Sequence, residues 1–160
     1  MKEVRPTSGR VVSALFSILG GKVQGAGFLD LFAGTGRVGL EALERGASEC
    51  VFVESVRSRA DELRRKAGGS LVLGLEVRRA VQWLVKRGRK FDVIFADPPY
   101  SSGWCEVLPG IAGLYDLFAE NAVMVVEHSV REVLECSAKI DEREYGETCL
   151  TFLQTCKKTP

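Results

Sequence analysis

Short apolar runs alternate with amphipathic stretches along the chain, and this alternation constrains the fold more than any other feature of the sequence. Each run has the length of a buried strand, and each stretch repeats its apolar side chains at helical spacing. The predicted strands are 28–32, 50–54, 71–77, 91–96 and 122–127, and the predicted helices are 37–45, 56–67, 80–86 and 108–118. Such alternation builds a parallel sheet that helices cover on both faces. We therefore expect an α/β fold.

Both ends of the chain depart from this alternation. Residues 139–145 and 148–155 are rich in β-forming side chains and are separated by Gly146-Glu147, which predicts a terminal antiparallel hairpin. Near the start, Ser8 precedes an apolar-periodic stretch, which predicts a capped helix packing on the sheet. No linker divides the 160 residues, so we expect a single domain over 1–160 with an N-terminal arm and helix in 1–22.

Composition places the chain among folded globular proteins, with 46% hydrophobic and 27% charged residues. No apolar run approaches the roughly 20 residues of a membrane span, and the first residues lack the apolar core of a signal peptide. We expect a cytoplasmic monomer without membrane contact. The five cysteines form no C-x-x-C pair and His128 is the single histidine, so we expect no metal site and reduced, buried thiols.

The charge balance gives no independent sign of nucleic-acid binding. With 22 basic and 21 acidic residues the net charge is +1, whereas a nucleic-acid-binding domain is usually strongly basic. Basic residues do cluster in 57–66, 78–79 and 86–90, beside apolar residues at helical spacing. This pattern is typical of a solvated helix face.

Residues 34–39 (GTGRVG) match the pattern G-x-G-x-x-G after a predicted strand and at the start of a predicted helix. Glu54 follows Gly34 by twenty positions, where dinucleotide-binding proteins place an acidic residue on a ribose. The physics does not require a dinucleotide. Glycines let the backbone approach any nucleoside, and an acidic residue at the end of the second strand can bind any ribose diol.

Asp30 discriminates between the possible ligands, because it lies in an otherwise apolar strand. Burying a carboxylate there is costly without a partner. A pyrophosphate would face it with a second anion, whereas S-adenosylmethionine carries an ammonium and a sulfonium that would relieve it. Amides at the end of the strand could also satisfy this carboxylate, so the loop by itself favours methyl transfer only modestly.

Residues 97–100 (DPPY) follow directly on the apolar strand 91–96. Ligands of open parallel sheets bind beyond the carboxyl ends of the strands, so this turn is expected at the same edge as the glycine loop. Two prolines fix φ and remove two N–H donors, which leaves a rigid turn with a carboxylate, a carbonyl and an aromatic ring. These groups suit an exocyclic amine on a planar base: Asp97 and the Pro98 carbonyl accept its N–H groups, and Tyr100 stacks on the ring. A capping aspartate in a tight turn is the alternative for the motif alone.

These residues resemble the amino-methyltransferases that act on adenine N6, cytosine N4 and guanine N2, whose signature is [DNS]-P-P-[YFW]. More narrowly, the chain resembles the RsmD family of guanine-N2 methyltransferases of small-subunit ribosomal RNA. The matching stretches span nearly the whole chain and include 5–7 (RPT), 29–36 (LDLFAGTG), 39–43 (GLEAL), 52–54 (FVE), 97–100 (DPPY) and 143–146 (REYG).

The resemblance implies a Rossmann-like class I methyltransferase fold with a mostly parallel sheet of seven strands and a C-terminal antiparallel hairpin. It implies S-adenosylmethionine as cofactor and ribosomal RNA or the small ribosomal subunit as partner. We expect catalytic roles for Asp97, Pro98, Pro99 and Tyr100, cofactor contacts from Asp30, Phe32, Ala33, Gly34, Thr35, Gly36, Glu54, Ser55 and Ala80, and RNA contacts from Arg5, Arg10 and Tyr145. Two alternatives stay open: an NAD(P)-dependent oxidoreductase that uses the glycine loop, and a non-catalytic nucleoside- or RNA-binding module.

Overall fold

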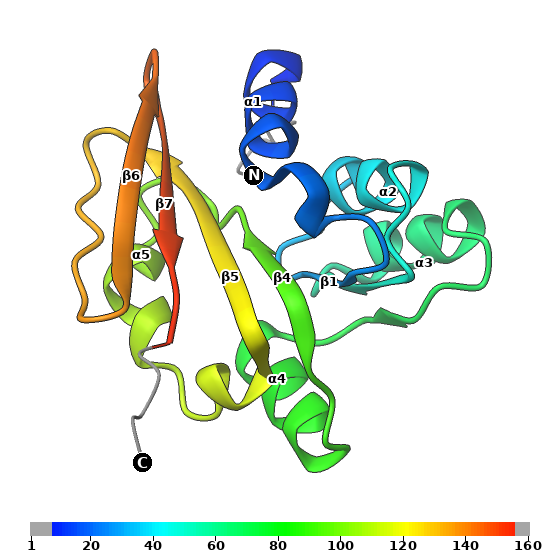
Figure 1. Ribbon diagram of the computed structural model, residues 1–160. Coiled ribbons are helices and arrows are strands. Elements are labelled where there is room, and N and C mark those ends of the chain that lie inside the picture. Colours follow the sequence, from blue (N-terminus) through cyan, green and yellow to red (C-terminus); the bar gives the residue numbers. More distant parts are fainter. Residues whose placement is uncertain (1–7, 156–160) are drawn as a thin grey trace.

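A computed structural model describes residues 8–155 of the chain (Figure 1). Its strands are β1 (Gly27–Asp30), β2 (Glu49–Val53), β3 (Val72–Leu73), β4 (Phe91–Ala96), β5 (Phe118–Ser129), β6 (Lys139–Tyr145) and β7 (Thr148–Leu153). The α-helices are α1 (Gly9–Leu19), α2 (Arg37–Glu44), α3 (Arg57–Lys66), α4 (Val77–Lys86) and α5 (Trp104–Val107). Short 3₁₀ helices are η1 (Gly20–Lys22), η2 (Leu108–Gly110) and η3 (Leu114–Leu117).

The strands form one seven-stranded sheet in the order β3-β2-β1-β4-β5-β7-β6. The first five strands pair in parallel, and β7 runs antiparallel to both β5 and β6. The terminal hairpin lies alongside β5 and away from α2 and α3 (Figure 1). The predicted α/β sheet with an antiparallel end is therefore confirmed. Between β1 and β4 the order of the strands reverses, and ligands of open α/β sheets bind at such a switch point.

Apolar side chains cover the sheet on both faces. One buried cluster joins the sheet to α1, α2 and α3, and the other joins its opposite face to α4 and α5. The alternation of side chains along each strand separates the two clusters, as the neighbours Phe28 and Leu29 on β1 show. Helix α1 begins after Ser8, whose hydroxyl accepts the Val11 N–H, and its Phe16 stacks on Phe28.

The third strand and the helix after it differ from the prediction. The strand was expected over 71–77 and the helix over 80–86, whereas β3 holds two residues and α4 begins at Val77. The side chain of Glu76 accepts the Arg78 N–H and so caps the helix three residues earlier than expected. An apolar run cannot tell a strand from the first turn of a buried helix.

The predicted helix 108–118 is also wrong in its bounds. The structure has the short helix α5 and two 3₁₀ turns there, and β5 already begins at Phe118. Gly110 and Gly113 interrupt the helical pattern, and Asn121 adopts a left-handed φ of 63°. The register of β4 against β5 shifts between Phe91 and Val93, so the strand continues through an irregularity near Asn121. None of the helices in residues 8–155 is both long enough and apolar enough to cross a membrane.

Candidate active site

Three carboxylates converge at the carboxyl edge of the sheet. Asp30 ends β1 and pairs in register with Phe52 on β2 and Phe95 on β4. Glu54 and Asp97 each follow these partners by two residues and are the first residues after the two strands that flank β1. Burial raises the pKa of the Asp30 carboxyl most, and the charges of Asp97 and Glu54 raise it further. The parallel sheet thus brings together three acidic residues that are far apart in the sequence, at its switch point.

Asp30 is buried and only half satisfied. Its Oδ2 accepts the Gly39 N–H at 3.2 Å, whereas its Oδ1 is buried without a hydrogen-bond partner. Burial, and then the charges of Asp97 and Glu54, raise its pKa to about 7. The backbone amide that the sequence allowed as an alternative therefore accounts for one oxygen and leaves the other buried without a hydrogen bond among the described residues. An ionised carboxyl here would attract a cation and repel a pyrophosphate.

Glu54 joins the glycine loop to the second strand. Its Oε1 accepts the Gly34 N–H at 3.0 Å, and its Oε2 accepts the Val56 N–H at 2.7 Å. The Arg59 guanidinium approaches Oε2 to 3.8 Å. The carboxylate is buried and fixed from both sides, and each of its oxygens has a further lone pair for a ribose hydroxyl.

The glycines of the loop are required by its geometry. Gly34 and Gly36 have φ values of 56° and 82°, in the left-handed region that side chains disfavour. At Gly39 an added Cβ would lie 2.4 Å from Cε1 of Phe52 and 2.7 Å from Sγ of Cys50. The third glycine therefore lets α2 approach β2 closely, and this approach carries the Gly39 N–H to Asp30.

The remaining cofactor residues expected from the sequence lie in the same loops, with one exception. Phe32, Ala33, Thr35 and Ser55 follow β1 and β2 at the carboxyl edge. Ala80 instead lies in the second turn of α4, where its side chain is fully buried and its N–H is donated to the Glu76 carbonyl. That position offers a ligand neither a free backbone donor nor an exposed side chain, because α4 begins earlier than the sequence indicates.

The turn at 97–100 directly follows β4 at the carboxyl edge of the sheet, as the motif predicts. Asp97 and Tyr100 are half-buried, Pro98 is buried and Pro99 is exposed. The Ser102 hydroxyl donates to the Pro99 carbonyl at 2.5 Å, and Ser101 has a left-handed φ of 55°. Such a φ is uncommon outside glycine, asparagine and aspartate, and it often marks a functional turn.

The structure places two of the three expected RNA-contacting residues. Arg10 is exposed at the start of α1, and Tyr145 ends β6. Tyr145 pairs with Thr148, which pairs with Ser129 at the carboxyl end of β5, so the tyrosine lies at the same edge as the turn 97–100. Arg5 lies outside the described residues.

Sequence reasoning missed one aromatic group beside the site. Trp104 lies edge-on to Phe32 at a centroid distance of 5.2 Å, and the Arg78 guanidinium carbon lies 4.8 Å from the Trp104 ring centroid. This stack connects the cofactor loop, the segment after the 97–100 turn and the start of α4. No motif marks Trp104, so only the tertiary contact reveals it.

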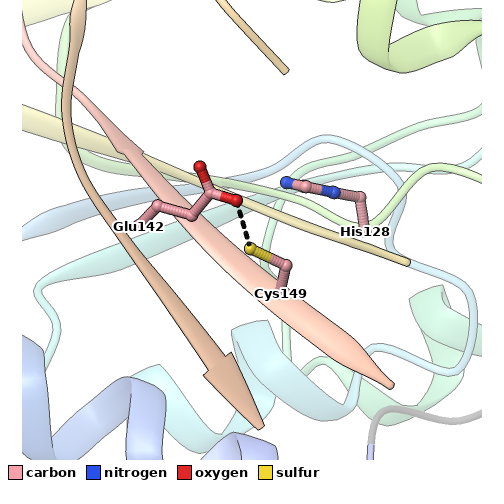
Figure 2. A group of neighbouring side chains, drawn as sticks. All are labelled: His128, Glu142 and Cys149. Atoms are coloured by element: carbon pink, nitrogen blue, oxygen red, sulfur yellow. Dashed lines mark hydrogen bonds between the residues drawn. The ribbon is translucent and has the colours of Figure 1, made fainter. Parts of the chain in front are cut away.

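A second polar cluster lies between β5, β6 and β7. His128, Glu142 and Cys149 each offer a possible metal-ligand atom, and these atoms lie within 4.8 Å of one another (Figure 2). The two ring nitrogens of His128 lie 2.9 Å from the Ser129 carbonyl oxygen and 2.7 Å from the Thr151 hydroxyl.

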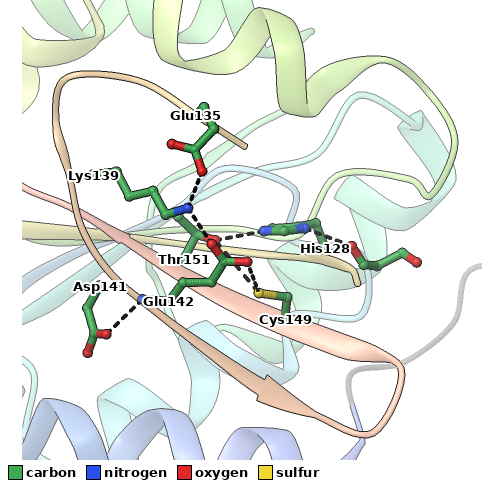
Figure 3. Close-up of polar contacts among 8 residues, drawn as sticks. His128, Glu135, Lys139, Asp141, Glu142, Cys149 and Thr151 are labelled. Carbon is green, nitrogen blue, oxygen red and sulfur yellow. Dashed lines mark hydrogen bonds and ion pairs between the residues drawn. The ribbon is translucent and has the colours of Figure 1, made fainter. Parts of the chain in front are cut away.

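The protonation of this cluster favours a hydrogen-bonded network over a metal site. The Cys149 thiol donates to Glu142 at 3.1 Å, and burial together with this contact raises its pKa to about 12. Metals bind the thiolate, which is disfavoured here. Lys139 forms ion pairs with Glu142 and Glu135, so a cation already occupies the carboxylate (Figure 3). The contacts of this cluster stabilise the packing of the β6–β7 hairpin against β5.

Solved structures similar to this chain share its whole architecture. A putative methyltransferase from Escherichia coli is 29% identical, with a TM-score of 0.76 over 93% of this chain and 86% of that one. A hypothetical protein from Thermus thermophilus is 30% identical, with a TM-score of 0.78 over 96% and 90% of the two chains. The fold and the site at its switch point define the protein as a class I methyltransferase of the Rossmann-like type.

The sequence comparisons give the family. The family described as Conserved hypothetical protein 95 matches residues 1–154. The Bacillus subtilis putative rRNA methyltransferase YlbH is 34% identical over 136 residues, 81% of this chain and 73% of that protein. The Escherichia coli K12 ribosomal RNA small subunit methyltransferase D is 32% identical over 136 residues, 82% and 67% of the two chains. The chain belongs to this family of RsmD-type methyltransferases.

Proposed function

We propose that this methyltransferase modifies the exocyclic N2 amine of a guanine in small-subunit ribosomal RNA. The observation that carries the proposal is the convergence of the 97–100 turn with the half-satisfied Asp30 at one switch point. The choice of ribosomal RNA and of guanine is supported by family membership, because the four residues of the turn suit several amines.

The cofactor would be held by residues of the first two strands. Asp30 would attract a cationic group of the ligand through its charge, since its carboxyl lies near those of Glu54 and Asp97 at the switch point. Glu54 would accept the ribose hydroxyls, and the loop 34–36 would let the backbone approach the nucleoside. When bound, S-adenosylmethionine supplies an electrophilic methyl group.

The base would be oriented by the 97–100 turn. The lone pair of the amine is delocalised into the guanine ring, which makes the nitrogen a poor nucleophile. The Asp97 carboxylate and the Pro98 carbonyl would accept hydrogen bonds from its two N–H groups, which favours a pyramidal nitrogen and withdraws the lone pair from conjugation with the ring. Tyr100 would stack on the base with about 1–3 kcal/mol. Because the reacting groups are aligned in this way, most of the catalysis is positioning, and the amine proton leaves to Asp97 or to water.

Transfer of labelled methyl groups to small ribosomal subunits, to naked ribosomal RNA and to DNA tests the proposal. We expect transfer to one or both RNA substrates and label at guanine N2 after digestion. Transfer to DNA alone, or label on another atom, would contradict it. Asp97→Ala should lower kcat by at least about a hundredfold and leave the Kd of S-adenosylmethionine nearly unchanged.

Asp116→Ala is the matched control, because Asp116 is an exposed carboxylate on η3 that precedes β5 at the opposite edge of the sheet. Its activity should equal that of the wild type. Calorimetry with NADH separates the oxidoreductase alternative: tight NADH binding without S-adenosylmethionine binding would refute the proposal. Cofactor binding without turnover on any substrate would instead support a binding module.

A further inference from the structure

An exposed groove of about 610 Å³ follows α4 on the face of the sheet opposite α1, α2 and α3. We call it the α4 groove. It is lined by Leu75, Arg78, Arg79, Gln82, Trp83, Lys86 and Arg87. Four of these seven carry a positive charge and none carries a negative one.

The helix itself creates this surface. Its buried side, Val77, Ala80, Val81 and Leu84, packs against the sheet. The basic residues occupy the helix positions between these buried residues, so they form one stripe along the outer side of the helix. From Val77 to Lys90 the chain has six Arg and Lys residues and no Asp or Glu. This local excess is hidden in a chain whose net charge is +1.

The cations of α3 do not form a comparable surface, because several of them bind the chain itself. Lys66 donates to the Thr35 carbonyl, and Arg64 donates to Asp61 and to the Val72 carbonyl. In the α4 groove, Arg78 pairs with Glu76, whereas Arg79 and Lys86 form no ion pair within residues 8–155. Arg57 and Arg65 of α3 also form no ion pair within residues 8–155, but Asp61 and Glu62 lie among the cations of α3, whereas no acidic residue lies between Val77 and Lys90.

Aromatic side chains connect the groove to the active site. The Arg87 guanidinium carbon lies 3.5 Å from the Trp83 ring centroid, and Arg78 covers Trp104. Trp104 in turn contacts Phe32 of the cofactor loop. The groove thus runs from the carboxyl edge of the sheet down the length of α4. A contact between an arginine and a tryptophan lies at each end.

We propose that the α4 groove binds the sugar-phosphate backbone of the substrate RNA on the strand that leads away from the methylated base. This inference rests on the proposed function. Closely spaced cations on an exposed surface complement the phosphates, which supply most of the affinity of nucleic acids for proteins. Arginine planes and aromatic rings are the groups on which unpaired RNA bases stack. Contacts of this type position the RNA and carry no sequence information themselves.

The double variant Arg79→Gln/Lys86→Gln tests the groove. The matched control is Arg57→Gln/Arg65→Gln, which removes the same charge from exposed positions of α3 on the other face. Direct binding of naked small-subunit RNA is measured from about 50 to about 300 mM salt, a range over which the Debye length falls by more than half. We expect the α4 variant to bind at least about fivefold more weakly at low salt, with a slope of log K against log[salt] that is smaller by about 1.4 for two lost phosphate contacts.

Four further results bear on the proposal. In the α4 variant the Kd of S-adenosylmethionine and the kcat at saturating RNA should be unchanged, and the KM for RNA should rise. Equal salt slopes in both double variants would overturn the groove while leaving methyl transfer by the wild type intact. A loss of affinity confined to assembled subunits would assign the groove to a ribosomal protein and also overturn the proposal. Wild-type binding through the groove without any methyl transfer would refute the proposed function instead.

Discussion

Asp30 combines burial, one amide contact and two neighbouring carboxylates in a single side chain. Its pKa of about 7 lies above the value of 3.8 that applies to an unfolded chain. The native state therefore binds more protons than the unfolded state between these values, and the carboxyl lowers stability progressively as the pH rises from about 4 to about 7. Binding of a cationic ligand reverses this preference, because it favours the ionised form.

Asp30→Asn should therefore stabilise the ligand-free protein above pH 7 by about 2 kcal/mol and have little effect at pH 5. The reason is that the Asp30 carboxyl is mostly protonated at pH 5, so the substitution removes a buried negative charge only at the higher pH. The same variant should bind S-adenosylmethionine at least about tenfold more weakly, because the positively charged group of the ligand would lose the attraction of the Asp30 carboxylate. Urea unfolding at pH 5 and pH 8 and calorimetry measure the two effects.

Asp92→Asn is the control for this prediction. Asp92 is exposed and accepts the Gly27 N–H at 2.8 Å, so its replacement should change stability equally at both pH values. If Asp30→Asn proved equally destabilising at pH 5 and pH 8, the carboxyl would not carry the proposed charge.

At the same scale, the sequence identified Asp30, Glu54 and Asp97 individually, because an acidic residue in or after an apolar strand is conspicuous. It did not identify Trp104 or the start of α4. Both depend on side chains that meet across the fold, and no local pattern records such contacts.

At the scale of helices and strands, the geometry of the glycine loop depends on how closely α2 packs against β2. Helix α2 approaches β2 at Gly39, where an added methyl group would lie 2.4 Å from Cε1 of Phe52. Gly39→Ala should therefore destabilise the protein by about 1–3 kcal/mol, and it should weaken cofactor binding because the helix moves its N–H away from Asp30. Chemical denaturation and calorimetry measure both quantities.

Gly21→Ala serves as the control, because Gly21 has nothing within 4 Å of an added Cβ. Its effect should stay within about 0.5 kcal/mol. A Gly39→Ala variant of wild-type stability would show that α2 has room to shift, contrary to the close approach described above.

The terminal hairpin depends on buried polar contacts as well as on its strand pairing. Thr151→Val removes the hydroxyl that lies 2.7 Å from Nε2 of His128 and leaves the buried imidazole nitrogen without this partner. We expect a loss of about 1–3 kcal/mol of unfolding free energy. Thr148→Val, at the half-buried start of β7, should cost less than about 0.5 kcal/mol, and equal effects of the two variants would contradict the role of the cluster.

Across the whole molecule, the proposed cofactor and base sites join loops that follow β1, β2 and β4, so ligand binding should stabilise the entire sheet. S-adenosylmethionine at about a hundred times its Kd should stabilise the native state by about 2.7 kcal/mol and raise Tm by about 5–10 °C. NADH should cause no shift, because a pyrophosphate would meet the carboxylates at the switch point. Thermal unfolding with each ligand measures this, and a rise with NADH alone would contradict the assignment of the loop.

At the scale of the molecule, the sequence by itself determined the class of fold, the antiparallel end and the two motifs of the site. Hydrophobic periodicity and glycine or proline chemistry are local properties, and they survive in a linear pattern. Only the tertiary structure decided that Asp30 keeps one oxygen without a partner, that Ala80 is buried in α4 and that the basic residues of α4 form one groove. The physical reason is that hydrogen-bond satisfaction, burial and the summation of charge depend on which elements become neighbours, and strand order is not written in any single segment.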